Sequence, residues 1–329
     1  MFTFSDEFAG VGGFRIALEA AGGNCVFSSE IDKWARETYE SLHGEAPQAS
    51  DAVVFPSEDR PDIDVLVGGF PCPSFSLAGI SRNNFLNRPS GFDDVKGGSL
   101  FFKLADILEK KQPRMFLFEN VKNITKHDKG RTIKVISDTI EEMGYTWQWR
   151  VFNANQWIPQ NRERCFMVGI RSDIVKDGDL DRIFDIHPPE QRVRLSEILV
   201  ENPDPKYNLS EKAWIGLIEH RRRHEEAGHG FGFGLVRPPF EDAETRTLMA
   251  RYHKDGSEIL IWRGEGIPPR RLTPIECFRL QGFPEDVVRR MIEEQPVSDT
   301  QMYRQAGNSI PVPIAMEIAR GMSEVLEEK

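Results

Sequence analysis

The sequence predicts an α/β fold, in which a mostly parallel sheet is covered by helices and carries a second, smaller, loop-rich domain. Over the first 170 residues, short apolar runs alternate with segments of helical periodicity, as strands joined by crossover helices require. A glycine-rich segment follows a short N-terminal strand and opens a helix. From about residue 185 to 269 this alternation gives way to stretches rich in Pro and Gly.

The expected elements follow in chain order. Apolar runs predict five strands after the N-terminal one, at residues 24–28, 64–69, 114–119, 146–153 and 164–170. Helical periodicity predicts helices at residues 99–110 and 132–143. Near the C-terminus, an apolar face at helical spacing predicts a helix that returns to the first domain; its members are Ile314, Ile318, Met322 and Val325. We therefore expect one domain from residues 1–185 and 300–329, and a second from residues 186–299.

Composition indicates a globular protein of the cytoplasm. Apolar residues make up 39% and charged residues 29% of the chain, which excludes a disordered or fibrous class. The sequence contains neither a signal peptide nor an apolar run long enough to cross a membrane, so we expect no membrane partner. The four cysteines are far apart and match no metal-binding spacing, which suits a reducing compartment and predicts no metal.

The net charge of −10 argues against a nucleic-acid partner for the chain as a whole. Residues 206–279 differ, because they carry 13 Lys and Arg against 11 Asp and Glu, a local net charge of +2. That local balance permits DNA binding without demonstrating it.

The segment Phe8-Ala9-Gly10-Val11-Gly12-Gly13-Phe14 predicts a ligand pocket, because glycines let a ligand approach the backbone closely. A dinucleotide fingerprint would place a third glycine where Arg15 stands, which counts against NAD. Glu30 follows the next strand and could bind ribose hydroxyls, and Asp51 could bind an adenine amino group. A tight strand-to-helix turn without a ligand explains the glycines equally well.

Two side chains suggest chemistry at one edge of the sheet. Cys72 lies in Gly69-Phe70-Pro71-Cys72-Pro73-Ser74-Phe75-Ser76, directly after an apolar strand, and is a candidate nucleophile. Glu119 ends the next apolar strand and could protonate an electron-poor ring. Each residue also has a structural interpretation, as a buried loop thiol or as an acid bonded to backbone amides. In Gln160-Asn161-Arg162-Glu163-Arg164, the arginines could hold a phosphate or a base carbonyl, or form a solvated turn.

Together these segments resemble the ordered motifs of the cytosine-5 DNA methyltransferase family of bacterial restriction-modification systems. FAGVGGF resembles its cofactor loop, GFPCPSFS its nucleophile loop, ENV its general-acid motif and QNRER its arginine motif. Arg271-Leu272-Thr273-Pro274-Ile275-Glu276 resembles the hinge motif, and Gln305-Ala306-Gly307-Asn308-Ser309 the last motif. The resemblance implies an S-adenosylmethionine-dependent, Rossmann-like fold with a target-recognition domain.

The resemblance also implies roles for single residues. Cys72 would attack C6 of a flipped cytosine, Glu119 would bond N3, and Arg164 would hold the base carbonyl with support from Arg162. The S-adenosylmethionine pocket would be lined by ten residues: Phe8, Val11, Gly13, Glu30, Ile31, Asp51, Pro71, Leu100, Asn308 and Ser309. Ile31 departs from the family, which often has an aromatic residue there to pack on the adenine.

Double-stranded DNA is the implied partner, bound by one copy of the chain, with a restriction endonuclease as a functional companion. Residues 77–98 are expected to close over DNA and to contact it through Arg82, Asn83 and Arg88. In the second domain, Thr245-Arg246-Thr247-Leu248 and the following Arg251 and Lys254 resemble the recognition core, with Thr247 and Leu248 as its Thr-Leu pair. Residues 257–261 resemble a branch that modifies sites starting CC and ending GG.

Three alternatives stay open at this point. A tRNA cytosine methyltransferase would use the same Cys and Glu chemistry, although the long recognition segment favours DNA. A catalytically silent DNA-binding regulator would not need Cys72 and Glu119, and the cofactor motif begins too near Met1 for an added helix-turn-helix domain. A cysteine hydrolase would need a histidine beside Cys72, for which His127 is the mid-domain candidate.

Overall fold

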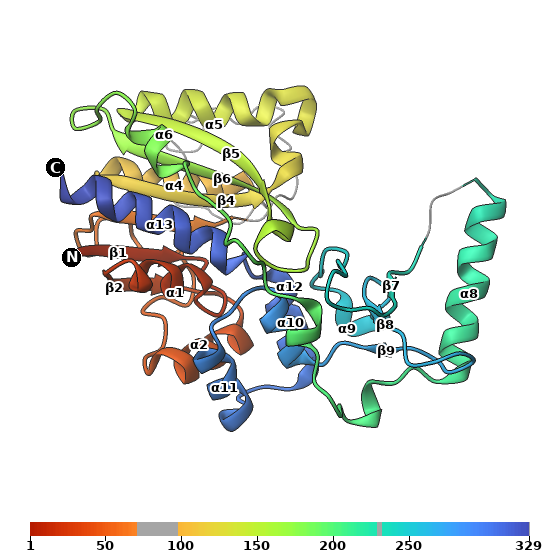
Figure 1. The fold of residues 1–329 in the computed structure, drawn as a ribbon. Coiled ribbons are helices and arrows are strands. Elements are labelled where there is room, and N and C mark those ends of the chain that lie inside the picture. The colour runs from red at the N-terminus through yellow and green to blue at the C-terminus, as the bar shows by residue number, and fades with distance from the viewer. Residues whose placement is uncertain (71–97, 229–231, 329) are drawn as a thin grey trace.

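The computed structural model describes residues 1–70, 98–228 and 232–328, and its centre is a six-stranded sheet with the order β2-β1-β3-β4-β6-β5 (Figure 1). The strands are β1 (Phe2–Glu7), β2 (Gly23–Ser29), β3 (Val65–Gly69), β4 (Met115–Val121), β5 (Tyr145–Asn153) and β6 (Glu163–Arg171). The first four in space are parallel, and β6 runs antiparallel to both of its neighbours. The predicted mostly parallel α/β sheet is confirmed.

The strands and helices expected in this half of the chain are present. Each of the five predicted strands begins and ends within two residues of an observed one. The predicted helices correspond to α4 (Gly98–Lys111), α5 (Arg131–Glu142) and the C-terminal α13 (Val312–Glu327). Periodicity found these elements because each buries a regular face.

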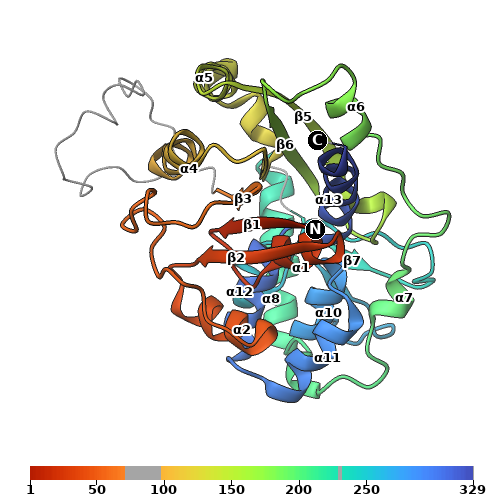
Figure 2. The ribbon, with the colours of Figure 1, turned by 90° about the vertical axis from the view of Figure 1, so that its left-hand side faces the viewer.

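Helices cover both faces of the sheet, and the strands alternate between two cores. Along β4, Met115 and Leu117 face the core under α1 (Gly13–Ala20) and α13, whereas Phe116 and Phe118 face the core under α4 and α5. Figure 2 shows α4 and α5 on one side of these strands and α13 on the other. Strands buried on both faces give the continuous apolar runs seen in the sequence. The C-terminal helix packs against α1, so it does return to the sheet.

The loop-rich region forms few regular elements. Three two-residue strands make a small sheet, β7 (Leu235–Val236), β8 (Leu260–Ile261) and β9 (Arg270–Arg271). Helix α8 (Glu211–Glu226) stands apart from the body in Figure 1 and buries no residue. On α8, Arg222 pairs with Glu219 and Glu226 of the same helix, as a solvated charged face does.

The remaining helical elements are short or connect the two regions. They are α2 (Lys33–His43), η1 (Lys122–Thr125), η2 (His127–Gly130), η3 (Ala154–Gln156), α6 (Asp179–Ile183), α7 (Leu195–Ile198), η4 (Pro205–Tyr207), α9 (Tyr252–Asp255), α10 (Pro274–Leu280), α11 (Glu285–Glu294) and α12 (Asp299–Asn308). Helix α10 begins with a capping box in the hinge motif, where the Glu276 amide donates to Thr273 and the Thr273 amide donates to Glu276.

Helix α12 packs against α2 on one side and against α9 and α10 on the other, so it joins the two regions. The domain boundaries at residues 185 and 300 stay a prediction. Within the described residues, no helix has the length and apolar character needed to span a membrane.

Candidate active site

The glycine loop between β1 and α1 forms the floor of a cavity of about 490 Å³ at the carboxyl edge of the sheet. Phe8, Gly10 and Gly12 have φ angles of 58°, 58° and 84°. These angles lie in the left-handed region, which residues other than glycine rarely adopt. A Cβ atom on Gly12 would lie 2.1 Å from Nε2 of His43, so the second glycine is required by packing as well as by conformation.

Glu30 is held at the wall of this cavity by backbone amides. Its carboxylate accepts hydrogen bonds from the amides of Gly10 at 2.8 Å and Asp32 at 2.7 Å. Burial raises the pKa of Glu30, and these amide bonds oppose the rise. Each carboxylate oxygen keeps a lone pair for a further donor, such as a ribose hydroxyl.

Eight of the ten predicted cofactor residues line this cavity: Phe8, Val11, Gly13, Glu30, Ile31, Leu100, Asn308 and Ser309. Ile31 lies at the rim with 73% of its surface exposed. Asp51 is not among the described residues that line the cavity, and its carboxylate accepts a hydrogen bond from the amide of Val53 in its own loop. Pro71 lies outside the described residues.

Helix α12 adds lining residues that the motif comparison missed. Gln301, Arg304, Gln305 and Asn308 line the cavity from successive turns of this helix. Their spacing of three, one and three residues marks one helical face, so extending the last motif toward the N-terminus would have found them. Arg15, which replaces the third glycine, points elsewhere and donates to Tyr39 and Glu19.

Glu119 and Arg164 form the opposite end of the cavity. Their strands β4 and β6 are antiparallel neighbours, and Nε of Arg164 lies 3.0 Å from Oε1 of Glu119. Burial raises the pKa of Glu119, while the positive charges of Arg164 and Arg162 act against that rise. A carboxyl group with these opposing influences can exchange a proton with a ring nitrogen.

Cys72 itself lies outside the described residues, but the strand that leads to it does not. In the parallel pair β3 and β4, Gly69 is the direct partner of Glu119. The Asn120 side chain donates to the carbonyl of Phe70 at 2.7 Å and so fixes the last described residue before the cysteine loop. The prediction that two neighbouring strands end beside each other at this edge is confirmed.

The other three cysteines do not suit a nucleophile. Burial raises the pKa of the Cys25 thiol to about 12 and that of Cys165 to about 12, and it raises that of Cys277 well above its usual range. These thiols stay protonated and unreactive. His127 bonds to Thr132 and does not line the cavity, so nothing described supports a cysteine hydrolase.

Arg162 of the arginine motif is surrounded by backbone carbonyl groups. The residue is 2% exposed. Its guanidinium group donates to three backbone carbonyls, those of Leu248 at 2.8 Å, Gly307 at 3.1 Å and Ser309 at 2.5 Å. Through these bonds, Arg162 connects the recognition segment (residues 245–254) and the last motif (residues 305–309) to β6. Arg162 also lines the cavity, and its predicted role as a support for Arg164 stays a prediction.

The recognition segment is joined to the arginine motif along its length. The amide of Leu248 donates to the side chain of Gln160, and the Thr247 hydroxyl donates to the carbonyl of Asn161. Leu248 is fully buried, and the DNA contact predicted for it stays a prediction. Arg246 is exposed and donates to the carbonyl of Gly232.

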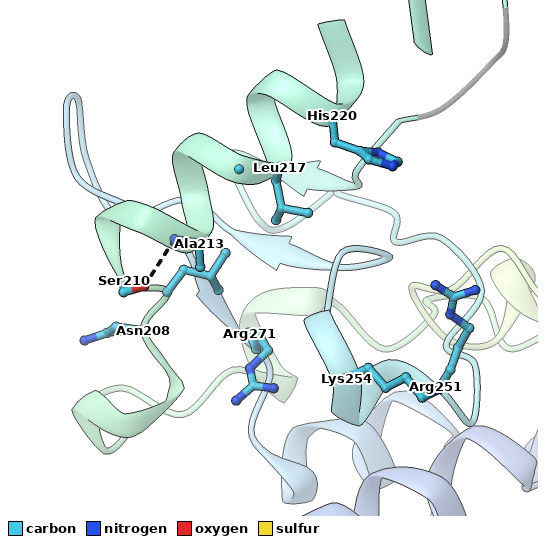
Figure 3. A pocket seen from close by; sticks show the side chains of 10 residues that line it. Asn208, Ser210, Ala213, Leu217, His220, Arg251, Lys254 and Arg271 are labelled. Carbon is cyan, nitrogen blue, oxygen red and sulfur yellow. Dashed lines mark hydrogen bonds between the residues drawn. The ribbon is translucent and has the colours of Figure 1, made fainter. Parts of the chain in front are cut away.

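Arg251 and Lys254 lie on a second cavity of about 520 Å³, between α8 and the recognition segment (Figure 3). Arg271 is the third cation there, and Ala213 and Leu217 of α8 face it from the other side. No acidic residue lines this cavity among the part of the chain that the structure describes. Arg82, Asn83 and Arg88 lie outside the described residues.

Comparison with known proteins agrees with this geometry. Residues 2–324 match the family model of C-5 cytosine-specific DNA methylases. The chain is 44% identical over 329 residues to the Type II methyltransferase M.NlaX of Neisseria lactamica, covering 99% of this chain and 97% of that protein. It is 42% identical over 328 residues to M.SsoII of Shigella sonnei, covering 99% and 81%.

The solved structures agree at the level of the fold. The S. pombe Dnmt2 methyltransferase superimposes with a TM-score of 0.76 at 20% identity, over 100% of this chain and 99% of that one. The extent of the family match and the identity to its curated members decide the classification. The chain belongs to the C-5 cytosine-specific DNA methylase family.

Proposed function

We propose that this protein transfers a methyl group from S-adenosylmethionine to C5 of a cytosine flipped out of a short duplex site, with Cys72 as nucleophile and Glu119 as acid. The observation that carries the proposal is the position of Glu119. It faces Gly69, three residues before Cys72, and it lines the same cavity as the glycine loop. The end of the strand that leads to the nucleophile, the acid and the cofactor floor thus lie at one edge of the sheet.

The proposed cycle uses Cys72 and Glu119 at its start and returns both to their initial states at its end. The Cys72 thiolate bonds to C6 of the ring, while Glu119 donates a proton to N3 and stabilises the charge that moves into the ring. Carbon 5 then becomes nucleophilic. Bound S-adenosylmethionine supplies an electrophilic methyl group for that carbon. Loss of the C5 proton to a base expels the Cys72 thiolate, Glu119 regains its proton, and the aromatic ring is restored.

The cavity carries an acceptor for the ribose of S-adenosylmethionine and a close-packed glycine loop beside it. Glu30 offers free lone pairs to ribose hydroxyls beside the strained Phe8. At the amino-terminal end of α1, the main chain at Gly13 packs closely against the Ile310 side chain. A Cβ on Gly13 would lie 3.0 Å from that side chain. The lining combines apolar and aromatic side chains such as Phe14 and Leu100 with polar side chains such as Asn308, which can fix the orientation of a ligand.

DNA would lie across the second cavity and the recognition segment. Arg251, Lys254 and Arg271 place three positive charges on one wall, inside a chain whose net charge is −10. We propose that Lys254 and Arg251 bind backbone phosphates, with Arg246 and Thr247 beside them. Arg82, Asn83 and Arg88 of the cysteine loop remain candidates for contacts that hold the flipped base in place.

The biological setting is also part of the proposal. We infer that the enzyme protects DNA in a restriction-modification system with a companion endonuclease, acts as a monomer on DNA, and modifies sites starting CC and ending GG. The match to a DNA-directed family favours DNA over tRNA as the substrate. The cytoplasmic location and the single-copy assembly stay predictions.

The test is expression of the wild type and of Cys72→Ser in a host without cytosine methylation, followed by conversion sequencing of its genome. We expect 5-methylcytosine at one recurring short site with the wild type and none with the variant. Methylation outside CC…GG sites would refute the site class alone. Unmodified DNA, from a wild type that binds S-adenosylmethionine, would refute the DNA-directed activity and make tRNA the next substrate to assay.

A further inference from the structure

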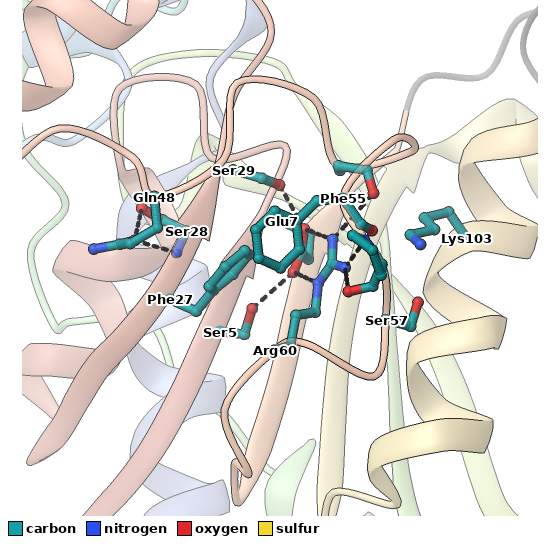
Figure 4. A network of polar contacts seen from close by, with 12 residues as sticks. Ser5, Glu7, Phe27, Ser28, Ser29, Gln48, Phe55, Ser57, Arg60 and Lys103 are labelled. Atoms are coloured by element: carbon teal, nitrogen blue, oxygen red, sulfur yellow. Dashed lines mark hydrogen bonds and ion pairs between the residues drawn. The ribbon is translucent and has the colours of Figure 1, made fainter.

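A fully buried ion pair lies behind the cofactor cavity, outside every motif used above. Glu7, the last residue of β1, and Arg60, in the loop before β3, both have fully buried side chains (Figure 4). Nε of Arg60 lies 2.8 Å from Oε1 of Glu7, and Nη2 lies 3.1 Å from Oε2. This fork-to-carboxylate arrangement fixes direction as well as distance.

The guanidinium of Arg60 also holds one loop along several points of its backbone. Nη1 donates to the carbonyls of Phe55 at 2.8 Å and Pro56 at 3.0 Å, and Nη2 donates to that of Ala52 at 3.0 Å. With the two bonds to Glu7, all five N–H groups of the guanidinium have acceptors. The group lies over the rings of Phe27 and Phe55, at 5.0 and 5.2 Å from their centroids. The loop that carries Asp51, the residue before Ala52, is therefore fixed to β1.

Glu7 extends the same network to two residues of the cavity. The Ser29 hydroxyl donates to Oε2 of Glu7 at 2.5 Å, and the Phe8 amide donates to Ser29 Oγ at 3.4 Å. Phe8 and Glu30, which line the cavity, are the residues that directly follow Glu7 and Ser29 in the chain. Phe8 has a φ of 58°, a conformation that persists only where surrounding contacts hold it.

A second contact holds the same loop from the other side. The Ser57 hydroxyl donates to Oδ2 of Asp106 on α4 at 2.5 Å, and Nζ of Lys103 lies 3.5 Å from that same oxygen. The loop is thus attached to β1 by Arg60 and to α4 by Ser57. Helix α4 also carries Leu100, which lines the cavity. The ends of β1 and β2 and helix α4, which lead to or carry Phe8, Glu30 and Leu100, are thus connected by one polar network.

Stability alone is a weak reason for such a network, since the cost of burying two charges roughly cancels their attraction and apolar side chains would pack as well. Fixed geometry is what an ion pair adds. We propose that Arg60 is a positioning residue for S-adenosylmethionine, holding the Asp51 loop and, through Glu7 and Ser29, the Phe8 and Glu30 ends of the cavity. This inference rests on the proposed cofactor site.

The chain offers a matched control for this pair. Arg270 and Glu276 form another buried fork, with Nη1 and Nη2 of the arginine each 2.8 Å from a carboxylate oxygen. Neither residue lines the cofactor cavity. Arg60→Lys and Arg270→Lys each keep the charge and remove the planar fork, so both should lower the melting temperature.

Calorimetry with S-adenosylmethionine and no DNA separates the two sites. We expect Arg60→Lys to weaken cofactor affinity at least about 10-fold, as removal of a supporting group does in other preorganised sites. Arg270→Lys should leave it within about 2-fold of the wild type. In steady-state assays, Arg60→Lys should raise the KM for S-adenosylmethionine while kcat at saturation and the KM for DNA change little.

A milder variant keeps the inference testable if Arg60→Lys does not fold. Ser29→Ala leaves the ion pair intact and removes the hydroxyl between Glu7 and the Phe8 amide, so cofactor affinity should fall several-fold and amide exchange should quicken near Phe8. Equal cofactor affinity in Arg60→Lys and Arg270→Lys, or in Ser29→Ala and wild type, would overturn the positioning role. A wild type that binds no S-adenosylmethionine would instead refute the cofactor site itself.

Discussion

Nε of Arg164 lies 3.0 Å from Oε1 of Glu119, and the two side chains are 13% and 12% exposed. Register between β4 and β6 produces this pair, since Val121, two residues beyond Glu119, is the direct partner of Arg164. A buried carboxyl prefers to be neutral, and a neighbouring guanidinium prefers it charged. The pair therefore sets how readily Glu119 can give a proton to a bound base.

Glu119→Gln should abolish most of the chemical step. Glutamine keeps the shape and can still bond N3, but it cannot transfer a proton. We expect the single-turnover methylation rate to fall by about 10²- to 10⁴-fold, with cofactor affinity unchanged. Rapid-quench assays with a labelled methyl donor measure the rate, and calorimetry supplies the control. A rate within about 10-fold of the wild type would remove Glu119 from the mechanism.

The pH dependence should report the Glu119–Arg164 pair. The protonated acid is the active form, so the rate should fall as pH rises through the raised pKa of Glu119. Arg164 lowers that pKa, and therefore Arg164→Met should move the alkaline fall to higher pH, whatever it does to the maximal rate. Thiolate formation at Cys72 raises the rate with pH and is common to both proteins. A fall at the same pH in both would show that another group titrates.

Arg162→Met should destabilise the fold more than a surface change does. It leaves three backbone carbonyls without their donor between the sheet, the recognition segment and the last motif. We expect a loss of about 3 kcal/mol or more in the free energy of unfolding, measured by urea denaturation. Arg222→Ala on α8 is the control, expected within about 0.5 kcal/mol of the wild type. Equal effects would mean that these bonds add nothing.

Lys254→Ala should weaken DNA binding through charge alone. Removing one phosphate contact should lower the slope of log affinity against log salt by about one, with similar losses on specific and unrelated duplexes. Fluorescence anisotropy over a salt series measures that slope. Arg222→Ala, whose side chain pairs with Glu219 and Glu226, should leave it unchanged. An unaltered slope in Lys254→Ala would place the DNA elsewhere.

Ile31→Phe should strengthen cofactor binding. Ile31 lines the cavity with 73% of its surface exposed, at the position where the motif resemblance led us to expect an aromatic residue. A ring there could stack on adenine, which predicts about 2- to 10-fold tighter binding of S-adenosylmethionine by calorimetry. Ile31→Ala should not gain affinity. If the phenylalanine variant binds no better than the alanine variant, the adenine does not lie at this side chain.

The sequence by itself determined the elements and the order of the chemical groups. Strand and helix periodicities are local, so the runs at β3 and β4 could be recognised without knowing their neighbours. The glycines of residues 10–13 predicted a tight strand-to-helix turn, and the structure supplies the reason for Gly12, whose φ is 84° and which lies against His43. Placing a cysteine and a glutamate after adjacent strands then followed from the rule that parallel strands end at one edge.

Only the tertiary structure decided what the side chains contact. The sequence predicts Arg162 as a support for its neighbour in the arginine motif, but not which groups it bonds. Its acceptors come from Leu248, Gly307 and Ser309, up to 147 residues away in the chain. Leu248 proved to be core, and Asp51 bonds within its own loop. Glu7 and Arg60, 53 residues apart, form a pair that no local pattern announces. Periodicity encodes which face of an element is buried, whereas the partners on that face are set by packing between distant segments.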